Sequence, residues 1–258
     1  MKKILILGAS GGIGCAISAD LKQRGFDVFV SSRTLDNLLT TLKTLSLTNE
    51  KGLIADISST LDLEKIADLV RTKNIDTVIN ATGSNHFAAL NQQRNSEIKE
   101  LLELNLTSSI LLTRDLVEVF KDQGQGTLIH VGSALGAIGL PGYSTYCASK
   151  FGLRGFCQSL SRELADTEIK IRYFSPRATD TKLNTNSVNK MNQELGVRCD
   201  SSEFVAKEFG KFITSKVDSY QVGWPEKLFV RLNGLYPELV SRTIKKQLST
   251  YKKYLEQT

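Results

Sequence analysis

The chain has 258 residues, 41% of them apolar, a net charge of +6 and four cysteines. This length and composition can bury one substantial core, and no linker divides the chain, so a single domain over residues 1–258 is expected. No apolar run approaches the roughly 18 residues of a membrane span, and the run after Lys2 and Lys3 is too short for a secretory signal. The basic residues are spread without a nucleic-acid-binding motif, and the cysteines lack metal-ligand spacing. We therefore expect a soluble, cytoplasmic protein that binds neither nucleic acid nor a metal.

Apolar runs typical of strands alternate along the chain with helical patterns. The alternation predicts an α/β fold of Rossmann type, in which helices cover both faces of a doubly wound parallel sheet in three layers. Ligands bind beyond the carboxyl ends of the strands in such folds, so functional residues should lie where strands end. The predicted strands are residues 4–7, 28–31, 52–55, 77–80, 127–131 and 170–174.

The first strand runs directly into a glycine-rich loop, and a helical pattern follows at once. An ordinary tight turn would explain one or two glycines, but not four in seven residues between a strand and a helix. Glycines let the backbone approach a pyrophosphate closely, and the helix N-terminus offers N–H groups and a positive dipole end to the phosphates. The loop predicts a dinucleotide site formed by Gly8, Ser10, Gly11, Gly12, Ile13 and Gly14.

The second strand ends at Ser32 and Arg33, where an acidic residue would bind the adenosine ribose and repel a 2′-phosphate. A guanidinium can instead form a bidentate pair with phosphate. NADP(H) is therefore the expected cofactor, with NAD(H) as the alternative. In that alternative Arg33 merely begins the next helix and faces water.

Ser133 follows the fifth strand, and Tyr146 and Lys150 come thirteen and seventeen residues later. Four-residue spacing places Tyr146 and Lys150 one helical turn apart on one face. A nearby ammonium favours phenolate, so Lys150 should lower the pKa of Tyr146 from its usual value near 10. Tyr146 would then exchange a proton near neutral pH.

In order and spacing, the glycine loop, Asn80-Ala81-Thr82-Gly83, Ser133 and Tyr146-Cys147-Ala148-Ser149-Lys150 resemble the classical short-chain dehydrogenases/reductases. The resemblance covers about residues 1–185. It implies that Tyr146 protonates a carbonyl oxygen as hydride arrives from NAD(P)H, and that Ser133 hydrogen-bonds the same oxygen. It also implies that Lys150 binds the nicotinamide ribose, and that Asn105, the polar residue of a leucine run, holds a water connecting Lys150 to solvent.

The resemblance extends to further cofactor contacts. It implies that Asp56 contacts the adenine amino group with the Ile57 backbone beside it. It implies further contacts from the ends of the fourth and sixth strands: Asn80, Ala81, Thr82, Gly83, Pro176, Thr179 and Thr181. Arg177 departs from the family's usual glycine after Pro176. It could cap the cofactor pocket, meet an anionic substrate or lie at the surface.

The last third of the chain departs most from the family. Residues 182–200 are polar and resemble its variable substrate lid, which we place within residues 183–216. Residues 225–258 form a variable helical extension, with one helix from about Pro237. Its apolar stripe could dock on its own domain, on a sister subunit or, through its basic neighbours, on an anionic membrane. The stripe consists of Val240, Ile244, Leu248, Tyr251 and Leu255.

The chain's ending looks like that of family members acting on lipid-like or acyl ketones. The resemblance therefore implies an NADPH-dependent reductase of a hydrophobic or 3-oxoacyl ketone. The alternatives are an NADP-dependent alcohol dehydrogenase working in the oxidative direction and a non-catalytic NADP(H)-binding sensor or scaffold. Family members usually pair through the helices that hold Asn105 and Tyr146, so a homodimer or homotetramer is expected.

Overall fold

The computed structural model describes residues 1–181 and 183–256. Lys182, at the start of the predicted lid, and residues 257 and 258 of the predicted extension lie outside the described residues. No helix in the described part is long and apolar enough to cross a membrane.

Seven parallel strands form one sheet in the order β3-β2-β1-β4-β5-β6-β7. The chain reverses its direction of winding between β1 and β4, which creates the crevice where ligands of such sheets bind. The strands are β1 (Lys3–Leu7), β2 (Asp27–Ser32), β3 (Gly52–Ile54), β4 (Thr77–Asn80), β5 (Gly126–Val131), β6 (Ile169–Ser175) and β7 (Ser219–Gln221). The predicted fold class is confirmed.

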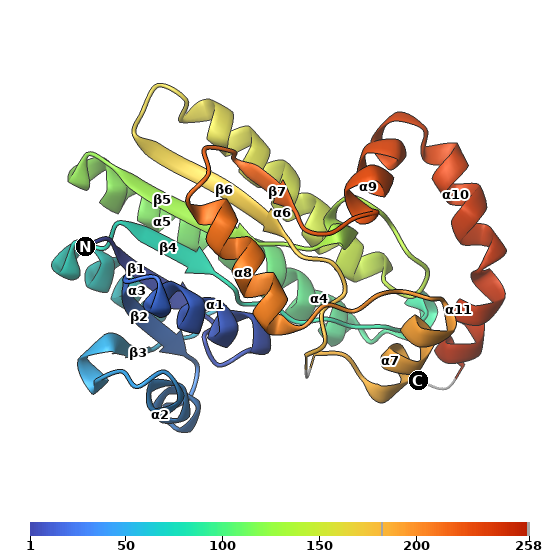
Figure 1. Ribbon diagram of the computed structural model, residues 1–258, viewed down its shortest axis with the longest axis horizontal. Coiled ribbons are helices and arrows are strands. Elements are labelled where there is room, and N and C mark those ends of the chain that lie inside the picture. The colour runs from blue at the N-terminus through green and yellow to red at the C-terminus, as the bar shows by residue number, and fades with distance from the viewer. Residues whose placement is uncertain (182, 257–258) are drawn as a thin grey trace.

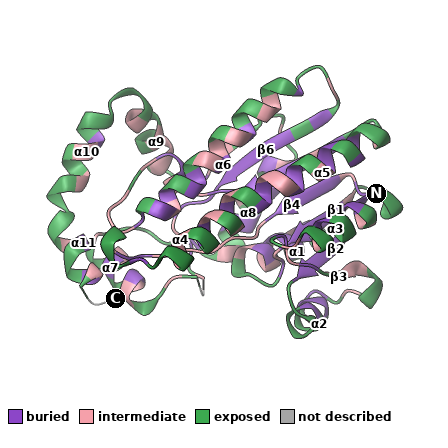
Figure 2. Cartoon of the chain, turned by 180° about the vertical axis from the view of Figure 1, so that it is seen from behind, coloured by how far each residue is buried: buried purple, intermediate pink, exposed green. Residues whose placement is uncertain are grey.

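Successive residues of a strand point to opposite faces of the sheet. One hydrophobic cluster therefore covers each face. Leu5 and Leu7 pack with the helices of one face, and Ile4 and Ile6 with those of the other. Figure 2 shows the buried strands between helices whose outer sides are exposed. The first face carries α3 (Thr60–Lys73), α5 (Ser108–Gln123) and α6 (Ser144–Glu163), and the second carries α1 (Gly12–Gln23), α2 (Leu35–Thr44) and α8 (Ser202–Ile213).

The structure adds one strand to the six predicted. β7 pairs with β6 from Ser219 to Gln221, and it is too short to show a periodic pattern in the sequence. The six predicted strands are all present, with ends shifted by no more than one residue.

The C-terminal extension forms three helices that curve away from the sheet beside α7 (Asn186–Glu194) (Figure 1). They are α9 (Glu226–Leu235), α10 (Pro237–Lys246) and α11 (Leu248–Leu255). The single helix predicted from Pro237 is wrong, because a tight turn at Gln247 breaks it, with the Gln247 N–H donating to the Ile244 carbonyl at 3.0 Å. The turn lets Tyr251 and Tyr254 pack with Val188 and Met191 of α7.

Candidate active site

The glycine loop joins β1 to α1 at the crevice of the sheet. Gly8 has a φ of 77°, and a Cβ there would lie 3.0 Å from the backbone of Ala81 and Thr82 at the end of β4. A Cβ on Gly14 would overlap the Gly8 carbonyl oxygen. No side chain caps α1 at Gly11, so its first N–H groups are open to an anion. This cradle fits the pyrophosphate of a dinucleotide.

A cavity of about 440 Å³ extends from this loop past the ends of β4, β5 and β6 to the C-terminal helices. It is lined by the predicted site residues Gly11, Gly12, Ile13, Gly14, Ala81, Thr82, Gly83, Ser133, Tyr146, Lys150, Pro176, Thr179 and Thr181. The other predicted residues, Gly8, Ser10, Ser32, Arg33, Asp56, Ile57, Asn80 and Asn105, do not line it. Gly8 and Ser10 belong to the glycine loop itself, and Asn80 and Asn105 lie behind the wall. The remaining four lie at the ends of the neighbouring strands β2 and β3.

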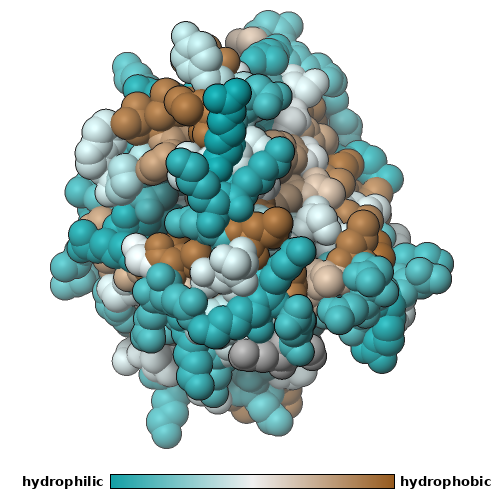
Figure 3. Space-filling view, turned by 90° about the vertical axis from the view of Figure 1, so that its right-hand side faces the viewer, coloured by the Kyte–Doolittle hydropathy of each residue, from teal (hydrophilic) through white to brown (hydrophobic). Residues whose placement is uncertain are grey.

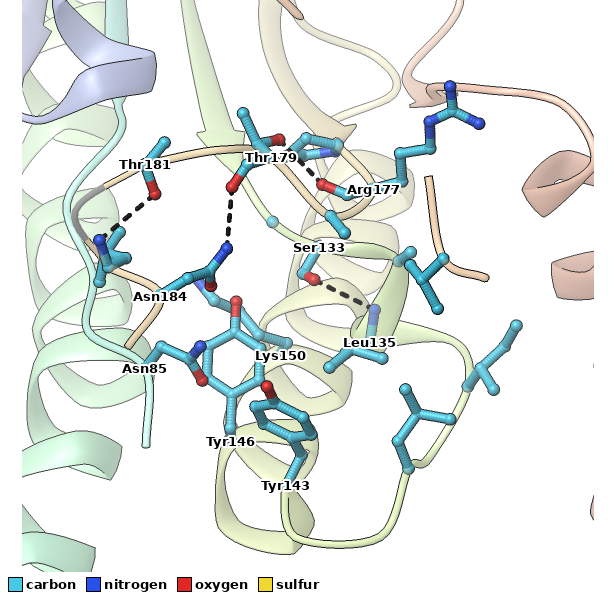
Figure 4. Close-up of a pocket in the computed structure, with 18 of the residues that line it drawn as sticks. Asn85, Ser133, Leu135, Tyr143, Tyr146, Lys150, Arg177, Thr179, Thr181 and Asn184 are labelled. Carbon is cyan, nitrogen blue, oxygen red and sulfur yellow. Dashed lines mark hydrogen bonds between the residues drawn. The ribbon is translucent and has the colours of Figure 1, made fainter. Parts of the chain in front are cut away.

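Ser133, Tyr146 and Lys150 gather on one wall of the cavity (Figure 4). Tyr146 and Lys150 lie one turn apart on α6, and the Lys150 Nζ is 5.8 Å from the centroid of the Tyr146 ring. Ser133 ends β5 and caps a short turn, where its Oγ accepts a hydrogen bond from the Leu135 N–H at 3.1 Å. The arrangement joins a phenol, a hydroxyl and an amine at one place.

The expected lowering of the Tyr146 pKa is wrong for this structure. Burial raises the pKa of Tyr146 to about 12, and a hydrogen bond with Ser133 offsets only part of that effect. Burial also lowers the pKa of Lys150 to about 8, which weakens the positive charge that was expected to favour phenolate.

Tyr173 of β6 fixes the position of Ser133, a role that the sequence did not reveal. The Ser133 N–H donates to the Tyr173 hydroxyl at 3.2 Å, and that hydroxyl is 3.4 Å from the Ser133 carbonyl. A Cβ on Gly132 or Gly136 would overlap the Tyr173 ring or hydroxyl, so both glycines make room for it. The only available signal was a phenol near the end of a predicted strand that also carries Lys170 and Arg172.

Asn105 lies behind the wall that Ser133, Tyr146 and Lys150 share, in a π-helical turn, Glu103–Thr107. Its amide exchanges two hydrogen bonds of 2.9 Å with the backbone of Ser84 and donates to Ser149 Oγ at 3.2 Å. Asn105 therefore joins the loop after β4 to α6. It also lies near the Lys150 amine, because a Cβ built on Gly83 would be 3.1 Å from Asn105 Oδ1 and 3.4 Å from Lys150 Nζ. Such π-turns occur often at functional sites.

Asn80 and His130 form a buried polar network at the ends of β4 and β5. The Asn80 amide donates to Ser109 Oγ at 3.0 Å and its oxygen accepts from the Thr82 N–H at 3.1 Å. His130 contacts Asn80 and Thr113 through its two ring nitrogens. Burial, with a smaller effect of Lys150, lowers the pKa of His130 to about 3, so the imidazole is neutral and structural.

The strand ends that would meet an adenosine lie beside the glycine loop. Ser32 Oγ is buried and has no hydrogen-bond partner among the described residues, while Arg33 next to it is exposed. The Asp56 carboxylate accepts a hydrogen bond from the Ser58 N–H at 2.9 Å, and Ile57 is buried. The site thus presents a free hydroxyl and a guanidinium at this end.

Arg177 points away from Tyr146 (Figure 4) and is only 7% exposed, which makes the surface alternative wrong. Its guanidinium binds Asp200 through two hydrogen bonds of 2.6 and 2.7 Å and Glu226 through one of 2.8 Å. These contacts, that with Asp200 foremost, raise the pKa of Arg177. Because its nitrogens are engaged by two carboxylates, Arg177 joins segments of the cavity wall instead of offering a site for an anionic substrate.

Thr179 and Thr181 lie on the loop after β6, above Ser133 and Tyr146 in Figure 4. Thr179 Oγ1 donates to the Arg177 carbonyl at 2.9 Å, and the Thr179 carbonyl accepts from Asn184 at 3.0 Å. The Thr181 methyl would be 3.0 Å from a Cβ on Gly12, so Thr181 covers the N-terminus of α1. Within the predicted lid segment, α7 faces the cavity, whereas α8 packs in the core against α1 through Val205 and Phe209.

Asn85, on the loop after β4, also lines the cavity and was not singled out in the sequence. Its Oδ1 is buried and has no hydrogen-bond partner among the described residues. Its side chain also hydrogen-bonds the Tyr143 hydroxyl, although burial is the larger effect and raises the Tyr143 pKa. An unpaired buried oxygen is costly, so it is a natural contact for a bound ligand.

Residues 2–192 match the family described as short chain dehydrogenase. The chain belongs to this family. As a short-chain dehydrogenase/reductase it is an NAD(P)-dependent oxidoreductase, and its cofactor is a nicotinamide dinucleotide.

One curated relative is the 3-oxoacyl-(acyl-carrier-protein) reductase FabG of Buchnera aphidicola. It is 33% identical over 187 residues, which cover 72% of this chain and 76% of the relative.

Two solved structures share the short-chain dehydrogenase fold. An actinorhodin polyketide ketoreductase variant with NADPH has a TM-score of 0.76 at 24% identity, covering 86% of this chain and 95% of that one. A 3-ketoacyl-(acyl-carrier-protein) reductase of Brucella melitensis with NADH also has a TM-score of 0.76, at 21% identity, covering 87% of this chain and 98% of that one.

Proposed function

We propose that the protein reduces a hydrophobic or 3-oxoacyl ketone to an alcohol with NADPH. One observation carries the proposal: Ser133, Tyr146 and Lys150 share a wall of a cavity that joins a dinucleotide cradle to a largely apolar chamber. The FabG relative, whose name describes reduction of a 3-oxoacyl group, supports the choice of substrate class.

A bound nicotinamide supplies the hydride that reaches the carbonyl carbon. Tyr146 donates the proton to the carbonyl oxygen. Its pKa of about 12 keeps the phenol protonated at neutral pH, which is the form a proton donor needs. Ser133 donates a hydrogen bond to the same oxygen and stabilises its developing negative charge.

Lys150 and Asn105 position the cofactor and the catalytic wall rather than contact the carbonyl group. Lys150 binds the ribose hydroxyls of the nicotinamide, and its pKa of about 8 leaves it able to take up and release a proton near neutral pH. Asn105 fixes the loop after β4 to α6 and keeps the amine next to Gly83.

NADP(H) is the proposed cofactor because of the adenosine end of the site. A 2′-phosphate there would meet the exposed Arg33 guanidinium and the unpaired Ser32 hydroxyl. We assign Asp56 and Ile57 to the adenine, Gly8 to Gly14 to the pyrophosphate, and Pro176, Thr179 and Thr181 to the nicotinamide end.

We propose a homodimer or homotetramer paired through the helices around Asn105 and Tyr146, where Phe151 of α6 is 42% exposed.

Cytoplasmic location agrees with four free cysteine thiols. Peripheral contact with an anionic membrane through the C-terminal helix is supported by Leu239 of α10, which is exposed and one turn from the basic Arg242. Figure 3 shows separate apolar areas among hydrophilic side chains on the side where α10 lies.

The test is oxidation of NADPH by the purified protein with 3-oxoacyl thioesters of increasing chain length and simple hydrophobic ketones. We expect turnover that Tyr146→Phe reduces by at least about a hundredfold while NADPH still binds, since a general acid contributes roughly 10²- to 10⁴-fold. Tight NADPH binding with no turnover of any ketone would instead favour the sensor or scaffold. Turnover unchanged in Tyr146→Phe would refute the proposed acid.

A further inference from the structure

The part of the cavity beyond Tyr146 has an apolar wall built from segments far apart in the chain. One side comes from the segment that follows β5, and the other comes from α7 and the C-terminal helices. The apolar lining residues are Leu135, Ile138, Leu140, Met191, Phe229, Val240 and Ile244.

The C-terminal helices are held in place by a hydrophobic cluster of their own. Tyr251 and Tyr254 of α11 are buried with Met191 of α7 and with Phe87 and Tyr143 beside the catalytic wall. Tyr251 itself lines the cavity, and the Tyr254 hydroxyl donates to Glu194 of α7 at 2.9 Å. The extension is therefore part of the wall.

Charged groups along the described lining are already engaged. Arg177 and Glu226 bind each other at 2.8 Å, and Lys150 belongs to the catalytic wall. The described lining thus offers no spare charge to bind a carboxylate or phosphate within the apolar part. A ligand that occupies it must be uncharged there.

Apolar side chains also mark an opening of the cavity. Leu183, Val197 and Phe229 line it and are 49%, 38% and 40% exposed. The first two flank α7, and Phe229 lies on α9. Large apolar side chains left half exposed around a cavity indicate where an apolar ligand passes.

We propose that Met191, Phe229, Val240 and Ile244 form a subsite for an unbranched aliphatic chain carried by the ketone substrate. This rests on the proposed reductase function and names the part of the substrate that the C-terminal extension selects. The lining runs from Gly12 at the cofactor loop to Ile244 on α10, so the cavity reaches from the dinucleotide cradle to the C-terminal helices. Because the described lining beyond Tyr146 is apolar and holds no unengaged charge, it suits the aliphatic chain of a 3-oxoacyl substrate.

The kinetic test compares 3-oxobutanoyl, 3-oxooctanoyl and 3-oxododecanoyl thioesters of N-acetylcysteamine. For the unaltered protein we expect kcat/KM to rise by up to about fourfold per added CH₂ until the subsite is full. Ile244→Trp fills the subsite, so it should lower kcat/KM for the dodecanoyl substrate by about tenfold or more and change that for the butanoyl substrate by less than about twofold. Leu239→Trp on the same helix is the control, since Leu239 is 56% exposed and outside the cavity lining.

A second pair of variants on α9 keeps the test valid if Ile244→Trp fails to fold. Phe229→Ala alters the proposed subsite, and Leu228→Ala is its matched control. Phe229→Ala should lower kcat/KM only for the long-chain substrate. Leu228→Ala should leave kcat/KM unchanged for all substrates, because Leu228 is 42% exposed and outside the lining. Equal losses for all chain lengths, or the same losses in the controls, would overturn the subsite and leave the reductase intact.

A binding measurement separates the subsite from the reaction. Calorimetry with the 3-hydroxydodecanoyl thioester should show binding to the unaltered protein that Ile244→Trp weakens by about tenfold, even if no ketone is turned over. A protein that reduces ketones but prefers a fused bicyclic ketone to every linear chain would contradict the proposal.

Discussion

The guanidinium of Arg177 and the carboxylate of Asp200 form two parallel hydrogen bonds, of 2.6 and 2.7 Å, in a buried part of the cavity wall. The pair ties the segment after β6 to the segment before α8, and Glu226 adds the start of α9. Three segments that surround the site therefore depend on one side chain.

Arg177→Met should lower the free energy of unfolding by about 3–5 kcal/mol, because it leaves the Asp200 carboxylate buried without its partner. Urea denaturation measures the loss. Arg177→Met combined with Asp200→Leu should recover part of it, since both buried charges are then gone. A single variant as stable as the parent would show that the pair contributes little.

The stability of the protein should rise between about pH 8 and pH 10.5 through Lys150. Its pKa is about 8 in the folded state against 10.5 when exposed, so between these values the unfolded chain binds a proton that the folded protein does not. The contribution is at most about 3 kcal/mol. Denaturation of the parent and of Lys150→Met across this range isolates it, because other groups titrate in both. Identical pH dependence in the two would contradict the lowered pKa.

Tyr173→Phe should reduce kcat by about fivefold with little change in KM for NADPH. The variant removes the hydroxyl that accepts the Ser133 N–H, and a hydrogen bond of this kind is worth roughly 1 kcal/mol. Tyr220→Phe is the matched control, because its hydroxyl binds Glu208 on α8. Equal effects of the two variants would mean that the Tyr173 hydroxyl supports only stability.

Arg33→Asp should weaken NADPH about tenfold to a hundredfold and leave NADH nearly unchanged or improved. The change removes a cation that can pair with the 2′-phosphate and adds a carboxylate that repels it. The ratio of kcat/KM for the two cofactors is the measurement. Arg71→Asp, on the exposed side of α3, serves as the charge control. An unchanged ratio in Arg33→Asp would place the 2′-phosphate elsewhere.

Phe151→Asp should shift the protein towards monomer in analytical ultracentrifugation. Phe151 is an exposed aromatic side chain on α6, the helix expected to pair, and a carboxylate in an apolar interface is strongly unfavourable. Leu239→Asp on α10 should leave the mass unchanged. A parent protein that is already monomeric would refute the proposed assembly.

Local patterns in the sequence were sufficient for the fold class and for the outline of the site. The positions of six strands, the glycine loop and the Tyr146–Lys150 spacing depend on residues close together in the chain, so periodicity and loop composition could predict them. The structure accordingly has the predicted parallel sheet and brings Ser133 to Tyr146 and Lys150. The strand β7 was not predicted, because a segment of three residues is too short to show a periodic hydrophobic pattern.

Tertiary structure alone decided the features that depend on burial and on distant partners. Tyr146 and Lys150 were four residues apart in any reading, but only burial sets the pKa of one at about 12 and the other at about 8. Arg177 gave no sign of Asp200, twenty-three residues away, or of Glu226. The sequence determined which groups the protein possesses, while packing determined their solvation and their partners, because desolvation and long-range contacts exist only once the chain is folded.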